Sequence, residues 1–387
     1  MNRTGHKLAI RYAKWVFTFA LGINAAGCFA DNKATPAGWR TDCVGRMELT
    51  LPGDAATQSD SSQALRARGL RQSEYDYSHG AFSFDDDERG WTELTEGVVS
   101  AVSPPLTPKQ IDVLKKADAK QRQTNFAEYT KLAAARGETY ESVMVDTGTP
   151  RATAHRSKTG VGLFIELGDR VVMAGYRLNA GDFVHDKTVV PQLITNIRAR
   201  EVFDVPAEPG LCYPHVFVKD DSNRRRQIAV DYRSKARPDF HVVLWDATAY
   251  NPDKEGINPE DETSRRNTWR NKEPDRQIGF FWGQRRFEGD TLPEWSTVTK
   301  RVEMDGRTGL QSFIRLQRPN GTVDYEYYAV VRGDPKAKED TPDLALYVYT
   351  SNDYGKKKGL APIAKEEFIK MAQSVAASVK RRPVIGK

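Results

Sequence analysis

Histidines and carboxylates are the residues of this chain that could support catalysis or metal binding. Five of the six histidines lie beyond residue 30, and no two of them have the spacing of a metal-ligand pair. The chain has no Gly-x-Ser-x-Gly nucleophile turn, no His-Glu-x-x-His zinc helix and no glycine-rich phosphate loop. We therefore predict no catalytic residue, no cofactor and no metal site. We interpret the histidines as packing or surface residues: His79, His155, His185, His215 and His241.

Two acidic stretches carry enough carboxylates to suggest a cation site. Residues 251–262 place Asn, Asp, Glu, Gly and Glu at positions one, three, five, six and twelve of an EF-hand loop. Pro259 at position nine and the absence of convincing flanking helices argue against calcium. Residues 85–88 are four consecutive acids whose side chains point in different directions, which is typical of a solvated turn.

The missing motifs leave two interpretations of the chain open. One is an envelope enzyme with an unfamiliar active site, whose reactive groups would come from His215, Asp246 or Glu273. The other is a passive envelope lipoprotein.

The first 30 residues have the features of an export signal. Four basic residues between positions 3 and 14 precede an apolar run over residues 15–27, which is too short to span a bilayer. Residues 25–28 read Ala-Ala-Gly-Cys, similar to a bacterial lipobox but with alanine where that pattern prefers leucine. We expect either lipidation of Cys28 or ordinary cleavage near Ala30, and both outcomes export the protein.

The net charge of +6 comes mostly from this signal. Its four basic residues are part of a total of 58, so 54 remain against 52 acidic residues. Nucleic-acid binding needs a concentrated basic face and is therefore not predicted. An apolar content of 39% with 28% charged residues is ordinary for a folded soluble protein.

Cys43 and Cys212 are the two cysteines that remain after export. Paired thiols tend to close in an oxidising compartment, so we predict a disulfide between them. It would connect the first strand of the mature chain to a strand 169 residues later. The alternative is two unrelated buried thiols.

Residues 298–350 organise the predicted fold. Apolar-alternating stretches are separated by Asp305-Gly306 and Pro319-Asn320-Gly321, which predicts consecutive antiparallel hairpins. In the last stretch, Leu344, Leu346 and Val348 face one way, and Ala345, Tyr347 and Tyr349 face the other.

A C-terminal helix is expected to cover this sheet. Its apolar residues recur at helical spacing from residue 362 onward. Arg381, Arg382 and Pro383 should end the helix, with Lys380 to Arg382 solvated. The inward-facing residues are Phe368, Met371, Ala372, Val375 and Val379.

The N-terminal half repeats this plan of strands followed by a closing helix. Residues 43–51 should form one strand, 161–167 and 170–178 a hairpin, and 190–200 a helix. Thr107-Pro108-Lys109-Gln110 begins another helix, which runs to Arg136 and has a polar centre expected to stand in solvent. Its core-facing residues should be Ile111, Leu114, Phe126, Tyr129 and Leu132.

Two prolines and a glycine within Pro206–Gly210 predict a domain boundary. The predicted fold class is α+β, with a signal over 1–30 and two domains over 31–205 and 206–387. Each domain is an antiparallel sheet with packed helices. Strands at 216–218, 228–232 and 240–244 are expected to join the C-terminal sheet.

Residues 251–277 form a long, highly charged predicted loop, and loops of this length are usually functional or disordered. Tryptophan and arginine dominate binding hot spots, so we predict partner contacts here. The predicted contact residues are Arg265, Arg266, Trp269, Arg270 and Glu273.

Several strand signatures, taken in order, resemble a known family. They are Cys43-Val44-Gly45-Arg46 with Leu51-Pro52, residues 309–315, residues 325–329 and residues 344–349. Over residues 40–380 the chain is similar to the immunity proteins of type VI secretion lipase effectors. It departs from them in details such as Tyr213-Pro214, and the family's contact residues do not transfer one by one.

The resemblance implies two α+β domains in the periplasm and neutralisation of a phospholipase toxin by binding. We therefore predict a periplasmic inhibitor of a cognate antibacterial lipase, with no chemistry of its own. Lipidation of Cys28 would anchor it to the outer membrane.

Overall fold

The computed structural model describes residues 36–58, 92–94, 97–103, 105–157, 160–177, 186–219, 227–249, 273–284, 299–318 and 320–383. Thr35–Lys387 form one compact unit, to which all elements below belong. Outside the described residues lie the predicted export signal with Cys28, the acidic run 85–88 and residues 251–262.

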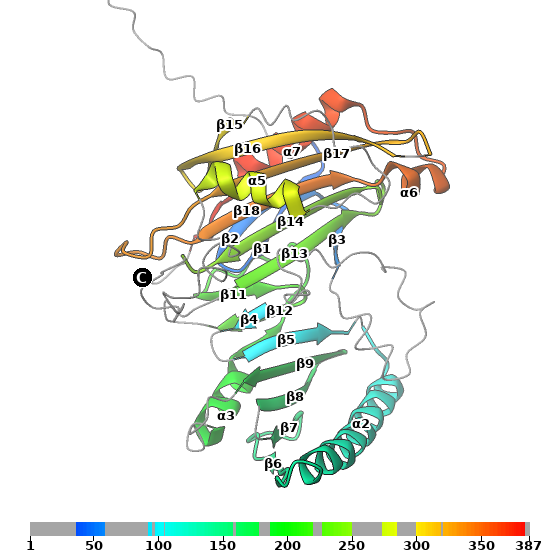
Figure 1. Cartoon of the computed structure of the whole chain (residues 1–387), viewed down its shortest axis with the longest axis vertical. Coiled ribbons are helices and arrows are strands. Elements are labelled where there is room, and N and C mark those ends of the chain that lie inside the picture. The colour runs from blue at the N-terminus through cyan, green and yellow to red at the C-terminus, as the bar shows by residue number, and fades with distance from the viewer. Residues whose placement is uncertain are drawn as a thin grey trace, which may run out of the picture. The chain divides into compact units, whose positions relative to one another are not determined.

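Antiparallel strands are the commonest element among the described residues and are accompanied by a few helices, so the α+β fold class is confirmed (Figure 1). Within the described ranges, the largest sheet has 13 strands, of which 12 form one path and β3 (Ala55–Gln58) pairs with β13 beside it. The path runs β15 (Lys300–Met304), β16 (Arg307–Gln317), β17 (Val323–Val331), β18 (Asp343–Thr350), β14 (Phe240–Ala247), β13 (Gln227–Ser234), β4 (Thr92–Leu94), β5 (Gly97–Val102), β9 (Arg170–Arg177), β8 (Gly160–Leu167), β7 (Ala152–Ser157) and β6 (Ser142–Val145).

The hairpins predicted over residues 298–350 are confirmed as β15 to β18. Successive strand residues point to opposite faces, and a different helix covers each face. Tyr327 packs in the core that includes α7 (Lys365–Ser378), whereas Tyr328 packs in the core that includes α5 (Pro274–Gln284). The Phe281 ring of α5 stacks on Tyr328 with centroids 3.8 Å apart. A short helix, α6 (Asn352–Lys357), follows β18.

Residues 43–51 form a hairpin rather than the single strand that we predicted. β1 (Trp39–Val44) and β2 (Met47–Pro52) pair through a turn at Gly45, whose φ of 56° favours glycine. A Cβ at Gly45 would overlap the Asp246 carboxylate, so the turn fits closely against β14.

A second small sheet contains β10 (Ile197–Ala199), β12 (Val216–Lys219) and β11 (Gly210–Tyr213). Two predictions are corrected here. The strand at 216–218 joins this sheet, not the C-terminal one, and the helix expected over 190–200 is α3 (Asp186–Asn196) followed by β10. Ile197 pairs with Val218, and strand pairing therefore ends the helix early.

The prediction that Lys380 to Arg382 form a solvated helix end is wrong. Helix α7 ends at Ser378, and β19 (Lys380–Arg381) pairs with β2 as the third strand of the β1–β2 sheet. The Arg382 side chain is only 2% exposed. It donates to the carbonyl oxygens of Pro206, Glu208 and Gly210, so distant backbone acceptors override the local preference for solvent.

The long helix begins as predicted. Thr107 caps α2 (Pro108–Ala134) in a full capping box with Gln110. Its polar centre does not stand in solvent, because Lys115 Nζ lies 2.6 Å from Glu166 Oε1 of β8, and Arg122 donates to Thr153 of β7.

Only the first part of α2 contributes to a core. Leu114 is buried with Ile111 beside it, as predicted. The expectation that Phe126, Tyr129 and Leu132 face a core is wrong, since these side chains are 44–48% exposed.

None of the helices in the described part of the chain is long and apolar enough to cross a membrane. The predicted boundary at Pro206–Gly210 lies between β10 and β11, which belong to one small sheet. The division into domains at 31–205 and 206–387 stays a prediction.

Candidate functional site

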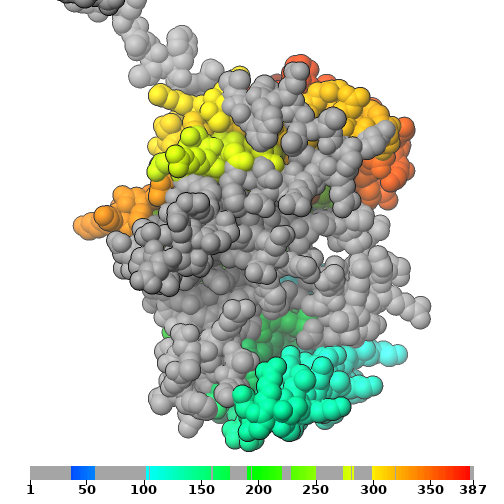
Figure 2. Space-filling model, viewed as in Figure 1, coloured from blue at the N-terminus to red at the C-terminus, as the bar shows by residue number. Residues whose placement is uncertain are grey.

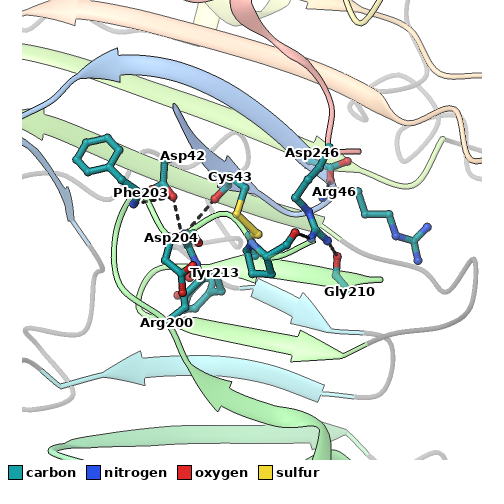
Figure 3. Close-up of a disulfide and its surroundings, with 12 residues drawn as sticks. Asp42, Cys43, Arg46, Arg200, Phe203, Asp204, Gly210, Tyr213 and Asp246 are labelled. Atoms are coloured by element: carbon teal, nitrogen blue, oxygen red, sulfur yellow. Dashed lines mark hydrogen bonds and ion pairs between the residues drawn. A yellow bond between two sulfur atoms is a disulfide. The ribbon is translucent and has the colours of Figure 1, made fainter. Parts of the chain in front are cut away.

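The predicted disulfide between Cys43 and Cys212 is present and links β1 to β11 (Figure 3). Next to it, Gly45 and Cys212 exchange two backbone hydrogen bonds of 2.8 Å each. Both sulfurs are fully buried. The β1–β2 turn is therefore fixed to β11 by a covalent bond and by backbone pairing.

A buried ion pair lies beside the disulfide. Arg200 Nη1 donates to Asp42 Oδ1 at 2.7 Å, and neither side chain is exposed to solvent. Asp42 also accepts from the Phe203 amide at 3.1 Å and from the Tyr232 hydroxyl at 2.9 Å. Arg200 further donates to backbone carbonyl oxygens, as Figure 3 shows, including those of Cys43 and Tyr213.

The charges in this cluster stabilise each other. Burial is the largest single influence on the pKa of Arg200 and lowers it. The attraction of Asp42, Tyr232 and Asp204 and the hydrogen bond to Asp42 together outweigh burial, so the net pKa is raised above its ordinary value. Burial, followed by the nearby Asp42 charge, raises the pKa of Tyr232 well above its ordinary value. Tyr232 therefore stays a neutral donor. Because these polar groups are used in bonds to one another, the cluster supports the scaffold rather than a reaction.

Two residues of the enzyme alternative, Asp246 and His215, lie on different elements. Asp246 lies on β14 and accepts the Arg46 amide at 2.8 Å. His215 lies in the turn between β11 and β12, where burial and then the charges of Arg170 and Arg200 lower its pKa to about 4. Such a histidine is neutral at pH 7. Among the described residues, no three metal-ligating side chains gather.

Most of the predicted partner-binding residues lie outside the described residues: Arg265, Arg266, Trp269 and Arg270. Glu273 is described, precedes α5 and is exposed. Its Oε1 lies 2.7 Å from Nη1 of Arg332, which follows β17. The structure therefore brings Glu273 to a surface and leaves the other four residues as a prediction.

A different exposed surface was not predicted. The large apolar side chains that the described residues expose all lie on α2 or β6. Apart from Val113, they gather on the second half of the helix and on the strand that follows it. We call this group, with Tyr140 between the two elements, the α2–β6 surface: Phe126, Tyr129, Leu132, Tyr140, Val143 and Met144.

Figure 2 shows α2, coloured cyan to green, as part of the molecular surface. The Tyr140 ring packs against Phe126 and Tyr129, with centroids 5.8 and 5.3 Å away. These contacts hold the chain after α2 against the helix. Val143 and Met144 on β6 follow within a few residues and are 48% and 64% exposed. The sequence signal for this surface was the uncharged stretch Ser-Val-Met-Val at 142–145.

Comparison with known proteins gives these features a family context. Residues 204–384 match the sequence model of a family described as the Tle cognate immunity protein 4 C-terminal domain. The resemblance to effector immunity proteins predicted from the sequence is thereby confirmed, whereas no curated protein sequence matches the chain. The matched residues include Cys212 and Arg382, and the α2–β6 surface precedes them in the chain.

Solved structures share the fold over most of the chain. TplEi, an immunity protein of the type VI secretion system of Pseudomonas aeruginosa, was solved with "L" peptide. It is 13% identical, with a TM-score of 0.55 and coverage of 90% of this chain and 99% of TplEi. The apo form of TplEi gives a TM-score of 0.54 at 15% identity, covering 90% and 98%.

A Tle4–Tli4 complex contains a further similar chain. It is 15% identical, with a TM-score of 0.55 and coverage of 90% of this chain and 98% of the other. At these identities the similarity establishes a shared fold.

Proposed function

We propose that this chain is an immunity protein that binds and inhibits a cognate type VI secretion lipase effector. The observation that carries the proposal is the match of residues 204–384 to the Tle cognate immunity protein 4 C-terminal domain. The similarity over 90% of the chain to a protein solved as a Tle4–Tli4 complex supports it. Binding of an effector is thus the function that both comparisons favour.

Inhibition by occlusion requires a surface that is already shaped before binding, because ordering a loose surface costs free energy. The buried Asp42–Arg200 pair and the Cys43–Cys212 disulfide support such a scaffold. The mechanism needs stoichiometric contact and no turnover. A non-enzymatic inhibitor is consistent with a polar cluster whose groups bind one another.

The periplasm is the proposed location. Residues 1–30 have the pattern of an export signal, and a disulfide persists in oxidising compartments. A lipid on Cys28 would add an outer-membrane anchor, which a Cys28→Ser variant would release. Two domains, over 31–205 and 206–387, remain part of this proposal.

The loop over 251–277 is a proposed effector contact. Trp269→Ala with Arg270→Ala should weaken effector binding and leave thermal unfolding nearly unchanged, because loop residues contribute little to a core. Lys109→Ala, an exposed charge on α2, is a control. Unchanged affinity would exclude Trp269 and Arg270 from the interface.

A growth assay tests the function itself. A periplasm-directed lipase effector, taken from the gene beside the one that encodes this chain, is expressed with the full chain or with a form lacking residues 1–30. We expect only the full chain to restore growth, because inhibitor and toxin must meet in one compartment. Equal rescue by the form lacking 1–30 would contradict the proposed location, and no rescue by either would contradict the function.

A further inference from the structure

The 13-stranded sheet ends in two strands of opposite character, β15 and β6. Natural edge strands are commonly protected by charged side chains, because an unpaired edge can bind another strand. β15 follows this rule with exposed Lys300, Arg301 and Glu303. β6 carries no charge, and it exposes Val143 and Met144 at 48% and 64%. Only the β6 edge is therefore chemically suited to accept an apolar strand.

The backbone of β6 is paired with another strand along one of its two edges. Residues 142–145 pair with Ser157 to Ala154 of β7, and β6 is the last strand of the order in the described part of the chain. In a strand, the N–H and C=O groups of alternate residues point to the other side. Those groups form a ready template for one more strand.

Helix α2 provides an apolar wall beside this edge. Its second half exposes Phe126, Tyr129 and Leu132, and Tyr140 connects that half to β6 through ring contacts of 5.8 and 5.3 Å. Figure 1 shows this end of α2 next to β6. An added strand would thus find backbone partners on β6 and apolar side chains on α2.

The charge of the β6 segment itself favours one kind of occupant, although Arg136 and Arg151 lie just beyond the segment and Arg156 of β7 pairs with Val143. Residues 137–150 contain three carboxylates, on Glu138, Glu141 and Asp146, and no lysine or arginine. Glu141 and Asp146 are exposed and flank the strand at its two ends. A second copy paired antiparallel at β6 would bring these like charges together, which is unfavourable. A segment with basic residues outside its apolar residues would match them.

We propose that β6 binds an extended segment of the cognate effector by strand addition. Val143 and Met144 are successive residues of β6 and point to opposite faces, so the segment has apolar residues on both of its faces, with lysine or arginine near Glu141 and Asp146. Main-chain hydrogen bonds supply affinity in this recognition mode, and side-chain contacts supply specificity. The inference rests on the proposed function, since it names the surface through which the effector is held.

Charged substitutions test this edge directly. Val143→Lys with Met144→Lys gives β6 the kind of protection that β15 has, and adds two positive charges. Glu303→Lys on β15 makes the same change in net charge at the opposite edge and is the matched control. Binding is measured by calorimetry with the lipase effector from the adjacent gene, inactivated at its catalytic serine.

We expect the double variant to bind about tenfold or more weakly, as hot-spot losses commonly do, and Glu303→Lys to bind like the unmodified protein. Hydrogen exchange on the unmodified complex should show slowed amides within 142–145. If the double lysine variant does not fold, Val143→Thr with Met144→Thr keeps strand propensity and should weaken binding in the same direction.

Three results would overturn strand addition. The first is full affinity in the folded β6 variant while the unmodified protein binds the effector, which leaves the proposed function intact. The second is no change in exchange at 142–145 in the complex. The third is a concentration-dependent dimer of the unmodified protein that the β6 variant loses, which would make a second copy the occupant. Failure of the unmodified protein to bind the effector would instead contradict the proposed function.

Discussion

Replacing Asp42 by alanine removes the only carboxylate within hydrogen-bond distance of the buried Arg200 guanidinium in the described structure. The two groups are 2.7 Å apart and neither is exposed. Breaking a buried pair from one side leaves an uncompensated charge and costs about 3–5 kcal/mol. The Phe203 amide also loses its acceptor, whereas Tyr232 keeps the Cys43 carbonyl oxygen at 3.3 Å. We therefore expect Asp42→Ala to lower the free energy of unfolding by about 4 kcal/mol.

The assay is chemical denaturation of the oxidised, mature protein, followed by circular dichroism. Asp112→Ala is the control, because Asp112 pairs with Lys116 at 2.7 Å on the exposed side of α2. An exposed helical pair of this kind contributes about 0.5 kcal/mol or less. Asp42→Asn should be intermediate, since it keeps an acceptor but loses the charge. If Asp42→Ala costs no more than Asp112→Ala, the account of the buried cluster is wrong.

Three further predictions concern the same part of the scaffold. Replacing Cys43 and Cys212 by serine should cost about 3–5 kcal/mol of unfolding free energy in denaturation, because the bridge spans 169 residues; a loss under about 1 kcal/mol would refute this. Arg382→Met should lower the free energy of unfolding by about 2–4 kcal/mol. Arg382→Lys should not restore that stability, since an ammonium lacks the planar fork with which the guanidinium reaches three carbonyl oxygens. Full stability of the lysine variant would contradict this role of Arg382. His215 has a pKa of about 4 in the folded chain, against an ordinary value of 6.5. Between these two pH values the histidine is neutral in the folded chain and protonated in the unfolded chain. The free energy of unfolding should therefore fall as pH drops from 6.5 to 4, by up to ~1.4 kcal/mol per pH unit. His215→Asn, which tolerates the φ of 61°, should reduce that slope, and an unchanged slope would assign it to other groups.

Local chemistry was enough to predict the C-terminal hairpins. Asp305-Gly306 forms the turn between β15 and β16, with both residues at positive φ. The alternation in β18 correctly assigned Leu344 and Tyr347 to opposite faces. Cys43 and Cys212 could be paired because Cys28, the one other cysteine of the sequence, falls in the predicted export signal.

Features that depend on distant backbone could not be read in this way. Arg382 was expected in solvent because it follows a helix, but its acceptors lie 172 to 176 residues earlier. A basic residue near a helix end is compatible with local sequence rules whether its side chain is solvated or buried. Only the folded structure shows which of these two environments the side chain has.

The α2–β6 surface was missed for a related reason. Apolar residues at helical spacing normally indicate a buried face, and Phe126, Tyr129 and Leu132 have that spacing. The core cluster under α2 contains Leu114, with Ile111 packed against it, and both lie in the first half of the helix, so the second half keeps the pattern without a core. The candidate site is thus recognisable as exposed only once the length of α2 is compared with its contacts.

Titration of lipase activity with purified protein tests the central claim most directly. Increasing amounts of the mature, oxidised chain are added to a fixed concentration of the effector from the adjacent gene, and lipid hydrolysis is followed. We predict a linear loss of activity that is complete near an equimolar ratio, because each inhibitor molecule occupies one effector molecule. Complete loss at strongly substoichiometric amounts would show that the chain modifies or degrades the lipase. Undiminished activity at excess inhibitor would contradict the proposed function.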